Sequence, residues 1–324
     1  RSFPEGAKME VGVTADARIP GRLTEIPQAR KTAKYITSNY SEFAGFPPPL
    51  TNGGLNEHGV AARDIWSPSR QELVDIAKEN APQTGPNYSD LARAVMERAT
   101  SAREAAELVG RLIDKHGFST YGGNSHLFAD AEEAWVLINY AAKGLWAAKR
   151  LGPDEVRVMY PGYIHEFPAD FKQRDGYMGS DNLVAFAREK GWWDGEGPLN
   201  LQKVYGKPFP ADTEQDFYPQ FYADGRNPPA REAELRKMAP VSLEDLMAYV
   251  RDPRWSTDFT GYGQVAHIRP DAPEELHTLW TAVTSGIITP FVPIPIAATS
   301  VPPEFSQHRY MTKNASSHFV DPDY

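Results

Sequence analysis

The residues best placed to do chemistry lie in the segment TNGGLNEHGVAAR at positions 51–63. A glycine pair precedes Asn56 and Glu57, and a small apolar run follows from Val60. Glycine tolerates positive φ and lets two backbones approach closely, as a turn beside a ligand site requires. The pattern therefore predicts a tight turn that delivers polar side chains to the end of a β-strand. A plain hairpin turn without chemistry fits these residues as well.

Composition removes several other kinds of site. The 324 residues contain no cysteine, which excludes disulfides, a thiolate metal site and a cysteine nucleophile within this sequence. The eight histidines are scattered, and none pairs with another at the spacing of a zinc-binding helix. We expect neither a metal nor another cofactor. No spacing joins hydroxyl, imidazole and carboxylate groups into a Ser-His-Asp site, and Asp64, Asp130 and Asp252 are expected to be turn or surface carboxylates.

Charge and hydropathy limit the classes of partner that this protein can bind. A net charge of -9 without any basic run argues against a nucleic-acid surface. With 41% hydrophobic and 24% charged residues, the mixture is that of a soluble globular protein. The longest uncharged stretch, residues 280–303, is interrupted by Pro290, Pro293 and Pro295, so it is expected to be extended and not to span a membrane.

Hydrophobic periodicity predicts strands before and after a group of helices. Strands are expected over residues 10–14, 22–38, 60–65, 125–129, 134–140, 145–150, 155–159, 263–268 and 280–301. Helices are expected from residue 69 and over 89–116, 181–191 and 242–251. Their starts are marked by capping boxes at Ser69 with Glu72 and Ser101 with Glu104, and by N-caps at Ser89 and Ser242.

The central strands are joined by short turns, which favours antiparallel pairing. Strands, helices and strands follow each other without regular alternation, so an α+β layered fold is favoured over a doubly wound one. We expect a single domain over residues 1–324, with a long irregular connection at 206–240 that is rich in Pro, Asp and aromatic residues.

Taken together, several motifs resemble the dipeptidase A and secernin family of cysteine peptidases, within the N-terminal-nucleophile (Ntn) hydrolase superfamily. They occur in the family's order across residues 21–319. The motifs are GGLNEHGVA at 53–61, FADAEEAWVL at 128–137, SDNLVAFAREKGW at 180–192 and VSLEDLM at 241–247. The resemblance implies an αββα four-layer sandwich, in which two antiparallel sheets pack between helix layers.

The resemblance also implies a chemistry. In the superfamily, the first residue of the mature chain is the nucleophile, and its α-amine, or water held by it, is the general base. Family members use cysteine and hydrolyse dipeptides or related small amides through an acyl-enzyme. Carried over by position, Asn56 is the candidate oxyanion donor. Gly54 and Glu57 are candidate binding residues, with Glu57 expected to brace the turn, and His58 receives no role.

Two departures from the family pattern concern the nucleophile and a polar contact. The family's opening segment with its Cys has no counterpart here, since the sequence starts at Arg1, as a processed or partial product does. Where the family carries Ser-x-Asn, this sequence has Tyr-Pro-Gly-Tyr at 160–163, and Pro161 cannot donate a hydrogen bond. Ser2 would become terminal if Arg1 were removed, but its surroundings resemble no nucleophile strand.

Three readings follow. In the first, the chain is the large fragment or subunit of an Ntn-type cysteine dipeptidase or amidohydrolase, with its nucleophile on a preceding segment or small subunit. In the second, it is a catalytically inactive relative that serves as a binding or assembly subunit. The third is a secreted carbohydrate-binding or adhesion module, suggested by the aromatic residues at 192–193 and 217–222. The expected partners are a small peptide or amide and homo- or hetero-oligomers, and the compartment stays open between export and the cytoplasm.

Overall fold

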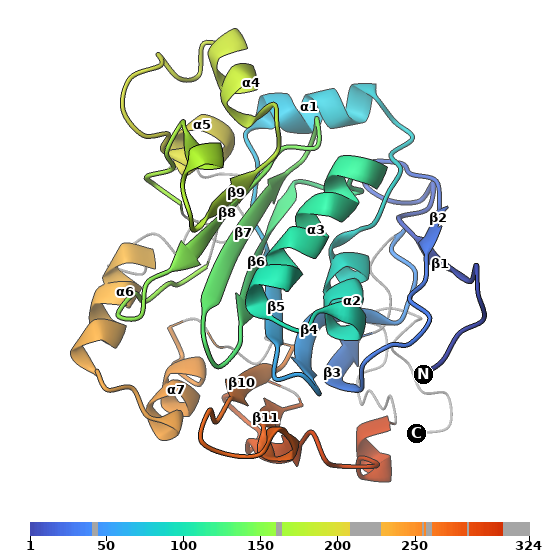
Figure 1. The fold of residues 1–324 in the computed structure, drawn as a ribbon, viewed down its shortest axis with the longest axis vertical. Coiled ribbons are helices and arrows are strands. Elements are labelled where there is room, and N and C mark those ends of the chain that lie inside the picture. The colour runs from blue at the N-terminus through green and yellow to red at the C-terminus, as the bar shows by residue number, and fades with distance from the viewer. Residues whose placement is uncertain are drawn as a thin grey trace.

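A seven-stranded antiparallel sheet organises the molecule (Figure 1). The computed structural model describes residues 1–40, 45–159, 164–207, 228–254, 256, 261–283 and 285–306. The strands follow the sequence in spatial order: β3 (Tyr35–Tyr40), β4 (Leu50–Asn56), β5 (Ala61–Trp66), β6 (Gly123–Ala129), β7 (Ala134–Tyr140), β8 (Trp146–Leu151) and β9 (Tyr177–Gly179). Short turns join β4 to β5, β6 to β7 and β7 to β8, and a connection of this kind produces an antiparallel pair. Strands β5 and β6 also pair antiparallel, although helices α1, α2 and α3 lie between them in the sequence.

Helices α2 (Tyr88–Arg98) and α3 (Ala102–His116) cover one face of this sheet (Figure 1). Their apolar stripes pack on side chains that alternate along the strands, such as Trp135 and Leu137 of β7. Because successive strand residues point to opposite faces, the residues between them face the other way. Two short strands, β1 (Lys8–Val11) and β2 (Thr24–Pro27), pair with each other and add to the same core.

The other face of β7 and β8 carries a second core. Val136 and Ile138, which alternate with the residues facing α2 and α3, pack here with Phe167. The helices that contribute to this core are α1 (Gln71–Glu79), α4 (Leu183–Glu189) and α5 (Leu201–Tyr205). The large sheet is therefore buried on both faces in this region, which requires apolar residues at consecutive positions of β7.

A second antiparallel sheet consists of β10 (Gly263–His267), β11 (Thr278–Ala282) and β12 (Val292–Pro295), in that order. Gln264 of β10 donates a hydrogen bond to Ser38 of β3 over 3.1 Å, so the small sheet contacts the large one. Two more helices, α6 (Pro228–Lys237) and α7 (Leu243–Val250), precede it, and α7 packs against β10. Short 3₁₀ helices occupy Phe171–Gln173, Glu274–Leu276 and Pro303–Ser306.

The predicted class is confirmed: the fold is α+β, with antiparallel sheets and helices that are consistent with the sandwich. Several local predictions are wrong. Residues 51–56 belong to strand β4, and only 57–59 form the turn. Residues 155–159 form no strand. Helix α6 occupies part of the predicted irregular connection at 206–240. The rest of that connection, residues 208–227, lies outside the described residues.

The helix starts agree only in part with the capping prediction. Helix α1 has no side-chain cap, because the Ser69 hydroxyl instead accepts from the Ala141 amide at 3.0 Å. The cap of α2 is Asn87 and not Ser89, with Asp90 completing a reciprocal capping box. Ser101 and Ser242 are N-caps as predicted, but the reciprocal bond of the capping box predicted at Ser101 is not formed, because the Glu104 carboxylate accepts from Thr100 instead.

Asn87→Ala tests how strongly this cap fixes helix α2. Besides its capping bonds, the Asn87 amide donates to the Gly12 carbonyl at 2.7 Å, and the side chain is buried. The substitution leaves buried backbone groups unpaired and should lower the free energy of unfolding by about 2 kcal/mol. Urea denaturation measures the loss. Asn80→Ala, which removes one exposed bond to Ile76 at the end of α1, should cost less than half as much. Equal losses of stability in the two variants would contradict the role of Asn87 as the cap that fixes helix α2.

Candidate active-site cavity

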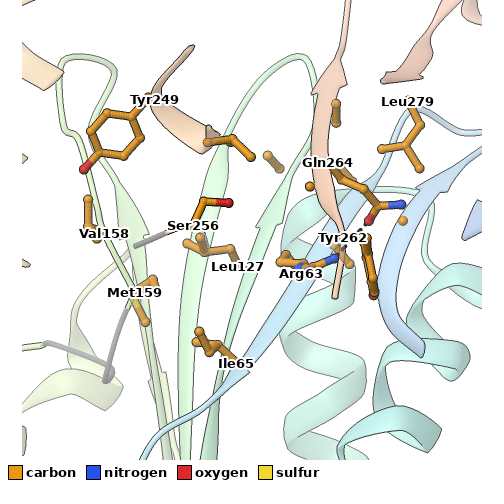
Figure 2. A pocket seen from close by; sticks show the side chains of 17 residues that line it. Arg63, Ile65, Leu127, Val158, Met159, Tyr249, Ser256, Tyr262, Gln264 and Leu279 are labelled. Atoms are coloured by element: carbon orange, nitrogen blue, oxygen red, sulfur yellow. Dashed lines mark hydrogen bonds between the residues drawn. The ribbon is translucent and has the colours of Figure 1, made fainter. Parts of the chain in front are cut away.

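A cavity of about 480 Å³ opens between the large sheet, the small sheet and helix α7 (Figure 2). Its size is within the usual range for sites that bind small molecules. It is lined by Gly54, Ala61, Ala62, Arg63, Ile65, Leu127, Ala129, Val158, Met159, Tyr249, Val250, Ser256, Tyr262, Gly263, Gln264, Ala266 and Leu279. Strands β4, β5, β6, β10 and β11 thus supply most of its wall.

Most of this wall is apolar. On β5, alternation points Ala61, Arg63 and Ile65 toward the cavity, whereas Ala62 packs its side chain in the core under helices α2 and α3. Leu127 of β6 continues the surface beside Ile65 (Figure 2). A ligand entering here would exchange water for apolar contacts over most of its length.

One side of the cavity is polar and positively charged. Figure 2 shows Arg63, Tyr262 and Gln264 together there. The Arg63 guanidinium lies 4.4 Å from the centre of the Tyr262 ring, and its Nη1 donates to Gln264 Oε1 over 3.0 Å. Arg63 is the single charged side chain among the described residues that line the cavity. Its charge is therefore the main electrostatic feature of this wall.

Two hydroxyl groups lie elsewhere on the wall. Ser256 is only 2% exposed, and its Oγ has no hydrogen-bond partner within the described part of the chain. Burial raises the pKa of Tyr249 to about 12, so that hydroxyl stays neutral at physiological pH. Ser256 can donate to or accept from a ligand, as any serine hydroxyl can.

A buried carboxyl group is connected to this wall by hydrogen bonds. The Tyr262 hydroxyl donates to Asn52 Oδ1 at 3.0 Å, and Asn52 Nδ2 donates to Asp64 Oδ1 at 3.0 Å. Asn124 donates to the other Asp64 oxygen at 2.8 Å. Burial raises the pKa of Asp64 to about 7, although these amide bonds and the charge of Arg63 oppose the shift. The prediction that Asp64 is a turn or surface carboxylate is wrong.

The two other acidic candidates lie where the sequence predicts. Asp130 accepts from the amides of Glu132 and Glu133, both at 2.8 Å, which fixes the turn between β6 and β7. Asp252 forms an ion pair with Arg254 at 2.6 Å. Neither residue lines the cavity.

Asn56 is the last residue of β4, next to the turn, and its side chain faces the helix layer. It is fully buried, and its Nδ2 donates to the Ala99 carbonyl at 2.8 Å and to the Met96 carbonyl at 3.4 Å. Its Oδ1 accepts from the amides of His58 and Val60. Asn56 thus fixes the β4–β5 turn to the end of α2, and it does not line the cavity. This geometry does not support the predicted oxyanion role, because the nitrogen and the oxygen of the Asn56 side-chain amide are both already bonded to backbone groups.

The glycine pair allows close packing of the strands. Gly54 lines the cavity, and a Cβ at this position would overlap the Ile36 carbonyl of β3. Gly53 has φ +112°, and a Cβ there would overlap the Ala62 carbonyl of β5. Glu57 lies outside the cavity, where its Oε1 accepts from the Lys34 amide at 2.9 Å. Gly54 is therefore the predicted binding residue that the structure places at the cavity.

Other sequence candidates lie apart from the cavity or outside the described residues. Ser2 forms an isolated bridge with Lys31 and is exposed. Residues 160–163 and 217–222 lie outside the described residues. Trp193 is 9% exposed and belongs to the core beside α4, and Trp192 packs on Arg70, so this pair forms no open carbohydrate-binding surface.

No local sequence pattern indicates the polar side of the cavity. Arg63 and Gln264 are separated by 201 positions, and no local motif joins them. Among the described residues, no three His, Asp or Glu side chains come close enough to hold a metal ion. The described helices include none with the length and apolar character needed to cross a bilayer.

Comparison with known proteins identifies a family to which this chain is related. The model of peptidase family C69 matches residues 37–230. A protein of Latilactobacillus sakei named "Probable dipeptidase" is 26% identical over 163 residues, which cover 50% of this chain and 33% of that protein. A "Probable dipeptidase" of Salmonella dublin is 28% identical over 170 residues, which cover 52% of this chain and 38% of that protein. The matched part thus spans about a third of the length of each relative.

Asp64→Asn tests the buried carboxyl group through its pH dependence. An unfolded Asp ionises near pH 4, whereas Asp64 in the folded chain holds its proton to about pH 7. Stability from this group is therefore present below pH 4 and falls as pH rises to 7. Asn mimics the neutral acid, so the stability of the variant relative to wild type should rise from pH 4.5 to pH 8, by on the order of 3 kcal/mol.

Urea denaturation at the two pH values measures this gain. Any fixed cost of the amide is the same at both pH values. The contribution of His126, whose pKa is lowered to about 4 by burial, changes between them, but it is the same in the variant and in wild type and cancels in their difference. A difference between variant and wild type that does not change with pH would contradict a raised pKa at Asp64.

Proposed function

Because the chain belongs to peptidase family C69, we propose that it forms the main part of an amide hydrolase that cleaves dipeptides or related small amides. The cavity between the two sheets is the proposed substrate site. The observation that carries this proposal is the shape and lining of that cavity: about 480 Å³, mostly apolar, with a single cationic side. Such a space accommodates a compact ligand with one apolar and one charged part.

The proposed reaction proceeds through an acyl-enzyme. A cysteine thiolate attacks the amide carbonyl, the C–N bond breaks, and the departing amine takes up the proton that the thiol gave to its base. Water then hydrolyses the thioester, which releases the acid and restores the thiol. In an Ntn-type enzyme the base is the nucleophile's own α-amine or water held by it.

The nucleophile in this proposal lies outside the 324 residues, on a preceding segment or a separate small subunit, since these residues contain no cysteine. The described residues would then supply binding and positioning. Gly53 and Gly54 let β4 approach β5 and β3 closely, and Asn56 holds the adjoining turn against α2. Asn56 acts in this scheme as a positioning residue.

A second function is a catalytically inactive family member that binds small peptides or assembles with other subunits. The absence of cysteine from this sequence favours it. The two functions differ in one observable, because only the first predicts turnover that depends on a thiol.

The complete gene product tests the choice between them. Mass spectrometry of the purified protein identifies the N-terminal residue of each chain, and release of amino acids from a dipeptide measures hydrolysis. We expect an N-terminal cysteine and hydrolysis that iodoacetamide abolishes. Hydrolysis that resists iodoacetamide would contradict the thiol mechanism, and binding without hydrolysis would favour the inactive subunit.

Ala61→Trp tests whether the cavity is the substrate site. Ala61 points into it from β5, and an indole there would fill much of the space. We expect the apparent KM for a dipeptide to rise at least tenfold, because steric overlap removes apolar contacts from the ligand. Steady-state kinetics measure the change. Ala185→Trp, on the exposed side of α4, is the control and should leave KM and the melting temperature unchanged. Unchanged KM in Ala61→Trp would place the substrate elsewhere.

A further inference from the structure

We infer that Arg63 anchors a carboxylate, so that the cavity selects small amides with a free carboxylate close to an apolar side chain. Dipeptides and N-acyl amino acids belong to this class, whereas their C-terminal amides do not. The inference rests on the proposed function for the nature of the reaction, but binding alone can test it.

The first argument is charge. Arg63 points into a cavity whose described lining contains no acidic side chain, and it forms no ion pair with any described residue. Asp64, its neighbour in sequence, bonds to Asn52 and Asn124 within the buried network. A cation among apolar walls is costly without an anionic partner. A ligand carboxylate would supply that partner.

The second argument is orientation. The Tyr262 ring stacks on the guanidinium at 4.4 Å, and Gln264 Oε1 accepts from Nη1 at 3.0 Å. Gln264 is itself fixed, because its Nε2 donates to Ser38 Oγ at 3.1 Å and to Thr281 Oγ1 at 3.4 Å. Arg63 is therefore oriented before a ligand arrives, which reduces the entropy lost on binding.

The third argument is donor geometry. A guanidinium carries five N–H donors in a rigid fork. Gln264 accepts from Nη1, and Tyr262 also forms a side-chain hydrogen bond with Arg63. The other donors can meet a carboxylate with two parallel bonds, the arrangement that Arg favours over Lys. A neutral C-terminal amide offers one acceptor oxygen and an NH₂ group that repels the fork. The geometry therefore discriminates between a carboxylate and an amide.

The fourth argument is the neighbouring apolar surface. Ile65 lies two residues along β5 on the same face, about 6.6 Å from Arg63 along the strand. Leu127 and Met159 extend that surface away from the charge (Figure 2). The spacing suits a carboxylate and the adjoining apolar side chain of one C-terminal residue. Leucine or phenylalanine at that position fits the wall better than aspartate or lysine.

Arg63 could also serve only to join the two sheets through Gln264. Melting temperature reports on that structural role, whereas discrimination between carboxylate and amide reports on the anchor. The experiment therefore measures both quantities on the same variants.

Isothermal titration calorimetry on the complete gene product, with its thiol alkylated, gives the affinities without turnover. The probes are Ala-Leu and Ala-Leu-amide. We expect wild type to bind Ala-Leu at least tenfold more tightly, as charge-assisted bonds imply. In Arg63→Gln the ratio should fall to within about twofold of unity. The control is Arg188→Gln, which removes another arginine stacked on an aromatic ring, Trp193, outside the cavity, and should keep the wild-type ratio.

Arg63→Lys provides a second measurement if Arg63→Gln fails to fold. Lysine keeps the charge but loses the fork, so the ratio should fall severalfold while the melting temperature changes little. A wild-type ratio near one, an unchanged ratio in either Arg63 variant, or no binding of Ala-Leu would overturn the inference. Carboxylate-dependent binding without hydrolysis by the untreated protein would contradict the proposed function and leave the inference standing.

Discussion

Burial of the large sheet on both faces is the constraint on which the rest of the structure depends. Each strand must place apolar residues toward helices α2 and α3 and, on its other side, toward a second core or the cavity. Strands β3, β4 and β5 lie beside the small sheet, and Gln264 of that sheet forms hydrogen bonds with Arg63 of β5 and Ser38 of β3. A cavity exists there because small residues such as Gly54 and Ala61 do not fill the space between the sheets.

Regular periodicity and capping chemistry made much of the fold predictable. The β6–β8 meander and helices α2, α3 and α7 appear where alternating or helical patterns placed them. Strand β4 was not predicted, because its glycines have low strand propensity. Its extended form comes from pairing with neighbouring strands, which only glycine can approach so closely. Helix α6 was not predicted, because its sequence has no apolar face. Its helical form therefore depends on neighbouring elements and not on its own hydrophobic pattern.

The site was predictable to a smaller extent. The segment 51–63 does contain residues of the cavity wall, but the conspicuous Asn56 serves the fold, and the charged residue that faces the ligand space is Arg63. Sequence spacing could not distinguish the two, because the direction of a side chain depends on the exact residue at which the turn ends. The partners of Arg63 come from the other sheet, about 200 positions away, and only tertiary packing reveals them. Asp64 was likewise assigned to the surface because burial of a carboxyl group leaves no local pattern.

The central claim is that the space between the two sheets receives the substrate. A crystal structure of the complete gene product with a dipeptide analogue that cannot be hydrolysed tests it most directly. The account predicts density for the analogue between β5 and β10, with its carboxylate at the Arg63 guanidinium and its side chain on Ile65 and Leu127. An analogue bound elsewhere, or bound here in the reverse direction with its carboxylate away from Arg63, would contradict it.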